Sequence, residues 1–301
     1  MIDGMKLSDI YIRDPFVLEE NGVYYLYGTM GEYSWEGGCG FDVYTSRDLT
    51  DWSGPYPVFR PEAGFWADKN FWAPEVFKYR GSFCMLASFY KDGAMRATQV
   101  LKADSPLGPF MPVTPEPQTP ADWMCLDGTL YVDGQGQPWM VFCHEWLQVT
   151  DGEICAMPLT EDLSRAAGDP VRLFTASQAA WTIPGANGQY ITDGPFLYRK
   201  QDGELLMLWS SFGRDGYSLT VARSRNGSVL GPWVNEESPL YTRNGGHGML
   251  FRDAQGTLLL SLHRPDSPYG LERPEFIPVR ESQEYGLELA EDGCTVTRLE
   301  A

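Results

Sequence analysis

Three aspartates occupy similar places along the chain and could carry out acid–base chemistry. Asp14 stands in Arg-Asp-Pro-Phe, Asp127 in Leu-Asp-Gly-Thr and Asp193 in Thr-Asp-Gly-Pro-Phe, each at the start of a short apolar run. Carboxylates gathered in one place repel and desolvate one another, which raises at least one pKa towards the range of a general acid. A single Asp-Pro or Asp-Gly is more often a turn, but three at equivalent places favour a functional site.

Two carboxylates on either side of a glycosidic bond can hydrolyse it. When they lie about 6.5–9.5 Å apart a water molecule fits between them and the anomeric configuration is inverted, whereas at about 5–5.5 Å one carboxylate attacks directly. Because the three aspartates stand in different repeated units of the sequence, we expect the wider spacing and therefore inversion.

The elements that would position these aspartates are five β-hairpins. Segments 13–29, 72–90, 126–146, 192–212 and 246–263 each contain an apolar run, a turn with glycine and a second apolar run. The residues that lead the five hairpins are Asp14, Ala73, Asp127, Asp193 and His247. Between the hairpins, segments 41–55, 95–110, 153–170 and 217–233 each read as an outer strand, a turn with Ser or Thr and a Gly-Pro-like stop.

A hairpin with two outer strands, repeated roughly every 55 to 65 residues, is typical of the blades of a β-propeller. We therefore predict an all-β fold, a five-bladed β-propeller that forms a single domain over residues 1–301, with two packed sandwiches as the alternative. The innermost strands of a propeller start at one face beside the central channel. The leading residues of the hairpins should therefore meet in one funnel.

Composition narrows the range of partners. The net charge is −18, and 14% of the residues are aromatic. An acidic chain is unsuited to nucleic acid or to an anionic membrane surface, so we expect neither partner and predict no oligomeric state. The sequence has no basic–apolar leader and no long apolar span, which predicts a cytoplasmic protein. Six scattered cysteines without a Cys-x-x-Cys pair are typical of reduced thiols rather than of a zinc site.

The motifs resemble those of glycoside hydrolase family 43. They are Arg-Asp-Pro-Phe at 13–16, Trp-Ala-Pro-Glu at 72–75, Leu-Asp-Gly-Thr at 126–129, Asp-Gly-Pro-Phe at 193–196 and Gly-His-Gly at 246–248. The resemblance implies a five-bladed propeller and an arabinanase, arabinofuranosidase or xylosidase activity. It implies that Asp14 is the general base, that Asp127 orients the acid and raises its pKa, and that Asp193 stands where the general acid stands. His247 resembles a channel histidine that helps to hold a hydrated Ca²⁺ or Na⁺ ion, a structural ion that the chemistry does not require.

One residue departs from the family pattern. The family usually has glutamate in Thr-Glu-Gly-Pro, whereas this chain has Asp193, whose carboxyl lies one methylene closer to the backbone. A misplacement of about 1 Å can cost on the order of a hundredfold in rate. We therefore keep Glu145, at the end of the returning strand of the third hairpin, as an alternative acid. A catalytically impaired site is the third possibility.

Other residues at the same face could bind substrate. The returning strands of the hairpins end where the leading strands begin, and Glu75 points to the same side as Ala73. Trp72, together with Trp35 and Trp146, could stack on sugar rings. For each of these residues a purely structural role is about as common. The predicted substrate-binding residues are Trp72, Glu75, His144, Glu145, Ser210 and Arg264.

The predicted activity is release of arabinofuranosyl or xylosyl units from plant-type oligosaccharides. An endo-acting arabinanase and a carbohydrate-binding propeller without turnover are the alternatives. A glycoside phosphorylase would need a cluster of cationic side chains for phosphate, and only Arg13 and Arg264 are expected nearby. A binding protein would be distinguished by gaining thermal stability with sugar while releasing no product.

Overall fold

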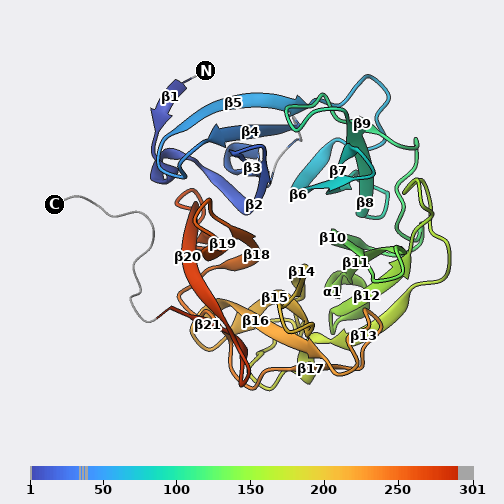
Figure 1. The fold of residues 1–301 in the computed structure, drawn as a ribbon. Helices are drawn as coiled ribbons and strands as arrows, with labels where there is room; N and C mark the ends of the chain where they lie inside the picture. Colours follow the sequence, from blue (N-terminus) through green and yellow to red (C-terminus); the bar gives the residue numbers. More distant parts are fainter. Residues whose placement is uncertain (1, 34, 36, 38–39, 291–301) are drawn as a thin grey trace.

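Alternating apolar residues and glycine-containing turns fold the chain into five small antiparallel sheets around a common axis (Figure 1). The computed structural model describes residues 2–33, 35, 37 and 40–290. Every strand in this part of the chain belongs to one of the five sheets. The arrangement confirms the predicted five-bladed propeller and excludes two packed sandwiches.

Each sheet begins with one of the predicted hairpins, and its outer strands follow in sequence. The first sheet has β2 (Ile12–Glu20), β3 (Val23–Met30), β4 (Phe41–Ser46) and β5 (Trp52–Phe59), with β1 (Ile2–Met5) added beside β5. The second has β6 (Lys69–Tyr79), β7 (Ser82–Tyr90), β8 (Ala97–Ala103) and β9 (Met111–Pro112). The third has β10 (Cys125–Val132), β11 (Pro138–His144), β12 (Glu153–Pro158) and β13 (Val171–Thr175).

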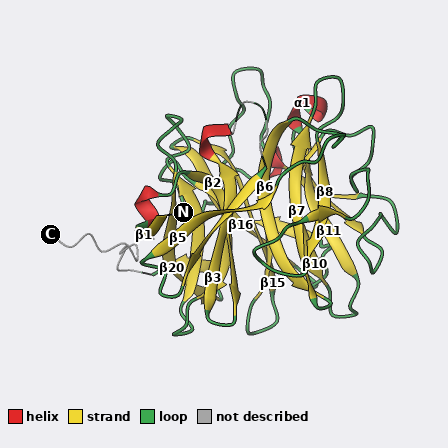
Figure 2. Ribbon diagram, turned by 90° about the horizontal axis from the view of Figure 1, so that it is seen from above, coloured by secondary structure: helices red, strands yellow, loops and turns green. Residues whose placement is uncertain are grey.

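The fourth sheet has β14 (Asp193–Arg199), β15 (Leu205–Gly213), β16 (Gly216–Ser224) and β17 (Trp233–Asn235). The fifth has β18 (Gly246–Arg252), β19 (Leu258–Arg264), β20 (Arg273–Ser282) and β21 (Gly286–Leu289). A short α-helix, α1 (Trp146–Val149), follows β11 and lies at one end of the propeller (Figure 2), and the described residues also form 3-10 helices at Leu7–Asp9, Gly31–Tyr33 and Ala176–Gln178. No helix within the described residues has the length and apolar character needed to cross a membrane.

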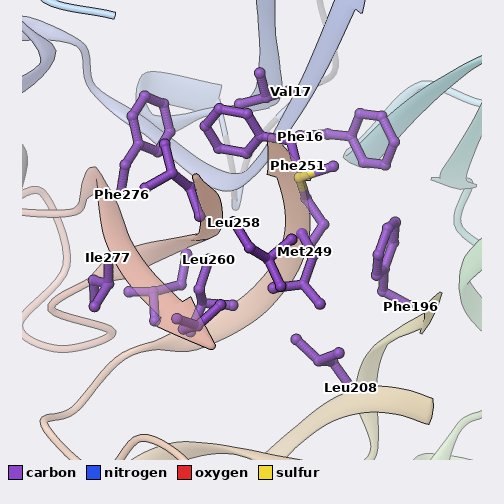
Figure 3. Close-up of a cluster of buried hydrophobic side chains, with 14 of the residues drawn as sticks. Phe16, Val17, Phe196, Leu208, Met249, Phe251, Leu258, Leu260, Phe276 and Ile277 are labelled. Carbon is purple, nitrogen blue, oxygen red and sulfur yellow. The ribbon is translucent and has the colours of Figure 1, made fainter. Parts of the chain in front are cut away.

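The hydrophobic core lies between neighbouring blades. In Figure 3, Phe16 of the first blade, Phe196 of the fourth and Met249 of the fifth belong to one such cluster. The rings of Phe16 and Phe196 meet edge to face, with 6.2 Å between their centroids. This cluster therefore joins the first, fourth and fifth blades.

Polar contacts join the first blade to the last and so close the ring. The Arg13 guanidinium forms ion pairs with Asp266 (2.7 Å) and Glu272 (2.9 Å), about 250 residues away in sequence. The Ser261 hydroxyl donates a hydrogen bond to the Pro15 carbonyl oxygen (3.0 Å). All of these groups are buried or nearly so, and water therefore does not compete for these ion pairs and this hydrogen bond.

Four cysteines, Cys84, Cys125, Cys143 and Cys155, are buried free thiols. Cys39 and Cys294 lie outside the described residues. Burial raises the pKa of Cys84 to about 11 and that of Cys155 to about 12, so these thiols stay protonated and behave as small apolar side chains.

Candidate active site

Each inner strand carries the same one-residue β-bulge near its start. In β2, Arg13 pairs with Thr29 and Phe16 pairs with Tyr27, so the inner strand has one more residue than its partner. The same interruption occurs in β6, β10, β14 and β18. A bulge of this kind re-aims a side chain and often lies next to an active site. Within the bulges the residues with left-handed backbone are Asp14 (φ 52°), Ala73 (φ 46°), Asp127 (φ 55°), Gly194 (φ 51°) and His247 (φ 52°).

The structure shifts one of the predicted leading residues by one position. The left-handed residue of the fourth blade is Gly194, and Asp193 comes directly before it, where the first blade has Arg13. The sequence alignment had placed Asp193 at the position of Asp14 and Asp127. Asp193 therefore enters the funnel from a different point of the bulge, although it lines the same cavity.

Asp14 is held in an environment that favours its charged form. Thr29 donates a hydrogen bond to Oδ2 of Asp14 (2.5 Å), and Nδ1 of His247 lies 3.2 Å from Oδ1. Burial alone would raise the pKa of Asp14, but the charges of His247 and His263 when these are protonated, the charge of Arg13 and the Thr29 hydrogen bond lower it below its ordinary value. An ionised carboxylate is what a general base needs at neutral pH.

Asp193 is held in an environment that favours its neutral form. Burial raises its pKa to about 7, with the charges of Asp14 and Asp266 acting in the same direction, while the Tyr217 hydrogen bond and Arg13 oppose the rise. The Tyr217 hydroxyl donates that hydrogen bond to Oδ2 of Asp193 (3.0 Å). A carboxyl group that holds its proton near pH 7 can act as a general acid.

Asp127 contacts Gly194 and His247, and its pKa depends on the charges of both Asp193 and Asp14. The main-chain N–H of Gly194 donates to Oδ2 of Asp127 (3.0 Å), and the same oxygen is 3.8 Å from Nδ1 of His247. Burial raises the pKa of Asp127 well above its ordinary value, and the charges of Asp193 and Asp14 raise it further. Asp127 and Asp193 therefore titrate as a pair rather than as two separate acids.

His247 is neutral at pH 7, because burial lowers its pKa to about 4. Its Nδ1 faces Asp14, and its ring packs so closely on Gly194 that a β-carbon there would come within 2.7 Å of the ring. Within the described residues no group of three or more His, Cys, Asp or Glu side chains could hold a metal ion. The residues therefore do not fit a directly chelated cation. His247 would be the single side-chain ligand of a largely hydrated Ca²⁺ or Na⁺, and no catalytic step below depends on such an ion.

These residues open into a cavity of about 460 Å³ with one strongly aromatic side. The ring of Trp35 contacts Trp72 (centroids 5.5 Å apart) and Tyr269 (5.0 Å), and the Arg13 guanidinium lies over both Trp35 and Tyr269. Aromatic faces beside charged hydrogen-bonding groups suit the apolar faces and hydroxyl groups of sugars. The residues that line the cavity are Arg13, Asp14, Thr29, Trp35, Asn70, Trp72, Arg96, Leu126, Asp127, Glu145, Trp146, Leu147, Ile191, Asp193, Phe212, Tyr217, His247, Asp266 and Tyr269.

Glu145 lines this cavity but is tied into a buried ion pair. Both of its carboxylate oxygens accept hydrogen bonds from Nη1 of Arg96. The Arg96 guanidinium in turn lies over the rings of Trp72 (4.5 Å) and Tyr90 (5.1 Å) and donates to Asn70. Burial raises the pKa of Glu145, whereas Arg96 opposes the rise. A carboxylate with both oxygens on a guanidinium is poorly placed to donate a proton, so the geometry favours Asp193 as the acid.

The other predicted binding residues lie around the cavity rather than in its lining. Glu75 is buried, and burial raises its pKa to about 8. Ser210 is buried and accepts the His247 N–H, and His144 stacks on the indole of Trp123. Arg264 is exposed and forms an ion pair with Glu275. Of the six residues expected to bind substrate, Trp72 and Glu145 reach the cavity.

Comparison with known proteins identifies the family. The model for glycosyl hydrolases family 43 matches residues 9–284, which is nearly the whole chain. The chain belongs to family 43. Its resemblance to the family in the motifs at 13–16, 72–75, 126–129, 193–196 and 246–248 is therefore confirmed.

Individual relatives of this family 43 protein include enzymes named for arabinan. The chain is 40% identical to a solved endo-arabinase of Bacteroides thetaiotaomicron, covering 94% of this chain and 99% of that one with a TM-score of 0.86. It is 26% identical to a solved thermostable family-43 glycoside hydrolase, with 98% and 94% coverage and a TM-score of 0.81. It is 25% identical to the extracellular exo-α-(1→5)-L-arabinofuranosidase ArbA of Cellvibrio japonicus over 81% of this chain and 71% of that protein.

Several cavity residues of the family 43 protein were missed from sequence. Tyr217 is the second residue of the third strand of its blade, and Arg96 stands just before the third strand of the second blade. Asp266 follows β19 and pairs with Arg13. The residues predicted from sequence at this face come mainly from the first two strands of each blade. Because antiparallel strands alternate in direction, the starts of the third strands reach the same face and could have been included.

We expect the pH profile of kcat/KM to decline on the alkaline side with an apparent pKa of about 7. Asp193 must carry a proton to act as an acid, and its pKa is raised to about 7, so activity is present below that pH and lost above it. Asp14 would have to be ionised to act as a base and its pKa is lowered, so the acidic limb should lie below the ordinary pKa of an aspartate. Initial rates on an unactivated oligosaccharide at a series of pH values would measure both limbs. A rate that rises through pH 7 and stays high in alkali would contradict the assignment.

Proposed function

We propose that the protein is an inverting glycosidase that releases arabinofuranosyl units from short α-1,5-linked arabino-oligosaccharides. The observation that carries the proposal is one cavity in which Asp14 has a lowered pKa and Asp193 a pKa raised to about 7. The names of the Bacteroides and Cellvibrio relatives support arabinan-type sugars as substrates. Xylosyl units are the alternative sugar.

In the proposed reaction, Asp14 accepts a proton from a water molecule as that water attacks the anomeric carbon. Asp193 gives its proton to the glycosidic oxygen as the bond between this oxygen and the anomeric carbon breaks. The new bond forms on the face opposite to the leaving group, so the configuration inverts. After one turnover Asp14 holds the proton and Asp193 is ionised, and exchange with solvent restores both groups.

The neighbouring groups support Asp14 as the base and Asp193 as the acid. The Thr29 hydrogen bond and the cationic Arg13 favour the ionised form of Asp14. Asp127 accepts the Gly194 N–H at Oδ2, and burial with the charges of Asp193 and Asp14 raises its pKa, so Asp127 and Asp193 share a proton as a coupled pair. His247 stays neutral and lies against both Asp14 and Asp127, which fixes their side chains relative to each other.

The shape of the cavity favours action near the end of a sugar chain. Trp35 and Tyr269 are exposed at the rim, contact each other and cover Arg13, which makes a wall on that side of the cavity. The Arg96–Glu145 pair and Trp146 also line the cavity, and the Arg96 guanidinium lies over Trp72, which contacts Trp35. A cavity of about 460 Å³ with this wall suits one or two sugar rings.

Internal cleavage of arabinan is the second candidate activity. The Bacteroides relative that is 40% identical over 94% of this chain is named an endo-arabinase. Phosphorolysis has less support, because Arg13 is paired with Asp266 and Glu272 and Arg264 is paired with Glu275 outside the cavity. Neither guanidinium is available as an unpaired anion site.

The product pattern from unactivated substrates tests the proposal. We expect the protein to convert linear α-1,5-arabinotetraose to arabinose and the next shorter oligosaccharides, and to act on xylotetraose at least about tenfold more slowly. Shorter oligosaccharides that appear from the middle of the chain before arabinose would show endo action. Binding of arabino-oligosaccharides, measured as a rise in Tm, with no product from any of these sugars would contradict an enzyme and indicate a carbohydrate-binding protein.

A further inference from the structure

A ring of hydrogen bonds links each blade to the next at the level of the active site. In each hairpin, one residue of the returning strand pairs with the residue just before the bulge. In four blades this residue has a side chain that accepts the N–H of the left-handed residue in the following blade. The four contacts are Ala73 N–H to Thr29 Oγ1 (2.8 Å), Asp127 N–H to Ser88 Oγ (2.8 Å), His247 N–H to Ser210 Oγ (2.8 Å) and Asp14 N–H to His263 Nδ1 (3.2 Å).

The fifth position of this ring is a cysteine. Cys143 of β11 pairs with Leu126 just as Ser210 pairs with Asp193, and it is fully buried. The N–H that a hydroxyl at this position would accept belongs to Gly194, which donates instead to Oδ2 of Asp127 (3.0 Å). A thiol sulfur is a weak hydrogen-bond acceptor, so it competes poorly with a carboxylate for this N–H.

We propose that Cys143 is a positioning residue for Asp127, because its lack of a hydroxyl leaves the Gly194 N–H to the Asp127 carboxylate. This inference deepens the proposed function and rests on it, since it assigns a cause to the placement of one carboxylate of the catalytic group. Gly194 directly follows Asp193, so the same hydrogen bond also ties Asp127 to the strand that carries the proposed acid.

A hydroxyl at position 143 would redirect this contact. In the other blades, Ser88 and Ser210 bind the corresponding N–H at 2.8 Å, which shows that serine has the right reach at this place in the fold. Asp127 would then lose its main-chain donor while remaining buried beside Asp193 and Asp14. Losing a hydrogen bond to a buried carboxylate is costly, and the carboxylate would turn towards another donor.

A role in packing alone makes a different prediction. A buried free cysteine usually behaves as a small apolar residue, and serine is then a mild change while alanine leaves a small void. The Thr192 hydroxyl lies near the Cys143 thiol and opposes the rise in thiol pKa that burial causes. An introduced hydroxyl that bonded to Thr192 would leave the Gly194 contact in place. The responses to serine and to alanine therefore separate the two roles.

The test compares Cys143→Ser with Cys143→Ala, and uses Cys155→Ser as the control for burying a hydroxyl. Cys155 is equally buried, on β12, and lies outside the ring. On an unactivated arabino-oligosaccharide we expect kcat to fall about tenfold to a hundredfold for Cys143→Ser, the range for a displaced catalytic group, with little change in KM. The other two variants should stay within about threefold of the unaltered protein. With an activated aryl arabinofuranoside the loss for Cys143→Ser should shrink, because acid assistance matters less there.

Two kinetic results would overturn the inference: a Cys143→Ser variant that keeps the kcat of the unaltered protein, or a Cys143→Ala variant whose kcat falls as far as that of Cys143→Ser. A crystal structure of Cys143→Ser keeps the test independent of the substrate assignment. We expect the introduced hydroxyl to accept the Gly194 N–H and the Asp127 carboxylate to move away. If the unaltered protein hydrolyses none of the sugars, the proposed function fails. Persistence of the Gly194–Asp127 hydrogen bond in that crystal would overturn the role of Cys143 in either case.

Discussion

Replacing Asp14 with asparagine is expected to lower kcat on arabino-oligosaccharides by about a thousandfold, within the range for loss of a general base. Asparagine has the same shape as aspartate but cannot accept the proton of the attacking water. The loss should be similar for an activated aryl substrate, because a better leaving group does not activate water. Initial rates with both substrates, at concentrations above KM, would measure the effect.

The Asp14→Asn protein should fold normally. Asp14 has a left-handed backbone (φ 52°), and asparagine adopts this conformation more readily than most residues. Its amide oxygen can still accept the Thr29 hydroxyl. Asp253→Asn is a matched control, because Asp253 caps the loop at the far end of the fifth hairpin and should leave kcat unchanged. An Asp14→Asn protein with an unchanged Tm and more than about a tenth of the original kcat would rule out Asp14 as the base.

Asp193→Asn is expected to show a loss that depends on the leaving group. With an unactivated oligosaccharide we expect a fall in kcat of about a hundredfold to ten-thousandfold, because the leaving oxygen needs a proton. With an aryl arabinofuranoside, whose leaving group departs without a proton, the loss should be about tenfold or less. The alkaline limb near pH 7 should also disappear from the residual activity, since the group that produces it is gone.

Glu145→Gln is the comparison that decides between the two candidate acids. Glutamine keeps the shape of Glu145 but weakens its ion pair with Arg96, which lines the cavity. We expect a higher KM and a lower Tm, with a loss in kcat that does not depend on the leaving group. A leaving-group-dependent loss for Glu145→Gln, together with survival of Asp193→Asn, would show that the acid has moved to the third blade.

The position of Asp193 bears on how a shorter acid could work in a family that usually has glutamate. Asp193 stands one residue before the left-handed Gly194, and its carboxyl still lines the cavity. Tyr217, which is almost completely buried, holds Oδ2 of this carboxyl. The absence of a side chain on Gly246 makes room for the tyrosine ring, since a β-carbon there would lie 2.7 Å from it. The Tyr217 hydrogen bond therefore holds the short Asp193 side chain from one side. The pKa of Asp193 is still raised, because burial outweighs this hydrogen bond.

The fold could be predicted from sequence because its signals are local and repeated. Each blade can be recognised in the sequence by a hairpin whose turn contains glycine, such as Asn21-Gly22 and Arg80-Gly81 in the first two blades. Five copies of such a unit cannot bury their apolar faces singly, so packing them around an axis follows from the repeat. The meeting of Asp14, Asp127 and His247 at one face follows from the same argument.

The one-residue offset of Asp193 was not predicted, because an alignment of the hairpins on their turns places Asp193 opposite Asp14. Matching Pro15 with Pro195 instead would have placed Gly194 opposite Asp14, as the structure does. The later blades also have longer hairpin loops, at 133–137, 200–204 and 253–257, so counting back from the turns gave no fixed distance.

Contacts between distant parts of the chain had no local signal at all. Arg13 pairs with Asp266 because the first and last blades meet around the axis, and Arg96 pairs with Glu145 across the boundary between the second and third blades. Tyr217 reaches Asp193 from the third strand of its blade, where sequence alone shows an ordinary aromatic strand residue. Tyr217 and Arg13 influence the pKa of Asp193, and Arg96 holds Glu145 in an ion pair. These contacts therefore matter more for the mechanism than for the fold.

The anomeric configuration of the first sugar released tests the central claim most directly. Proton NMR during the first turnovers on an α-linked arabino-oligosaccharide, before the product equilibrates, would record it. The account predicts the β-configured sugar, because a water activated by Asp14 attacks from the face opposite to the leaving group that Asp193 protonates. An α-configured first product would contradict the account, since it would mean that a carboxylate attacks the sugar and forms a covalent intermediate.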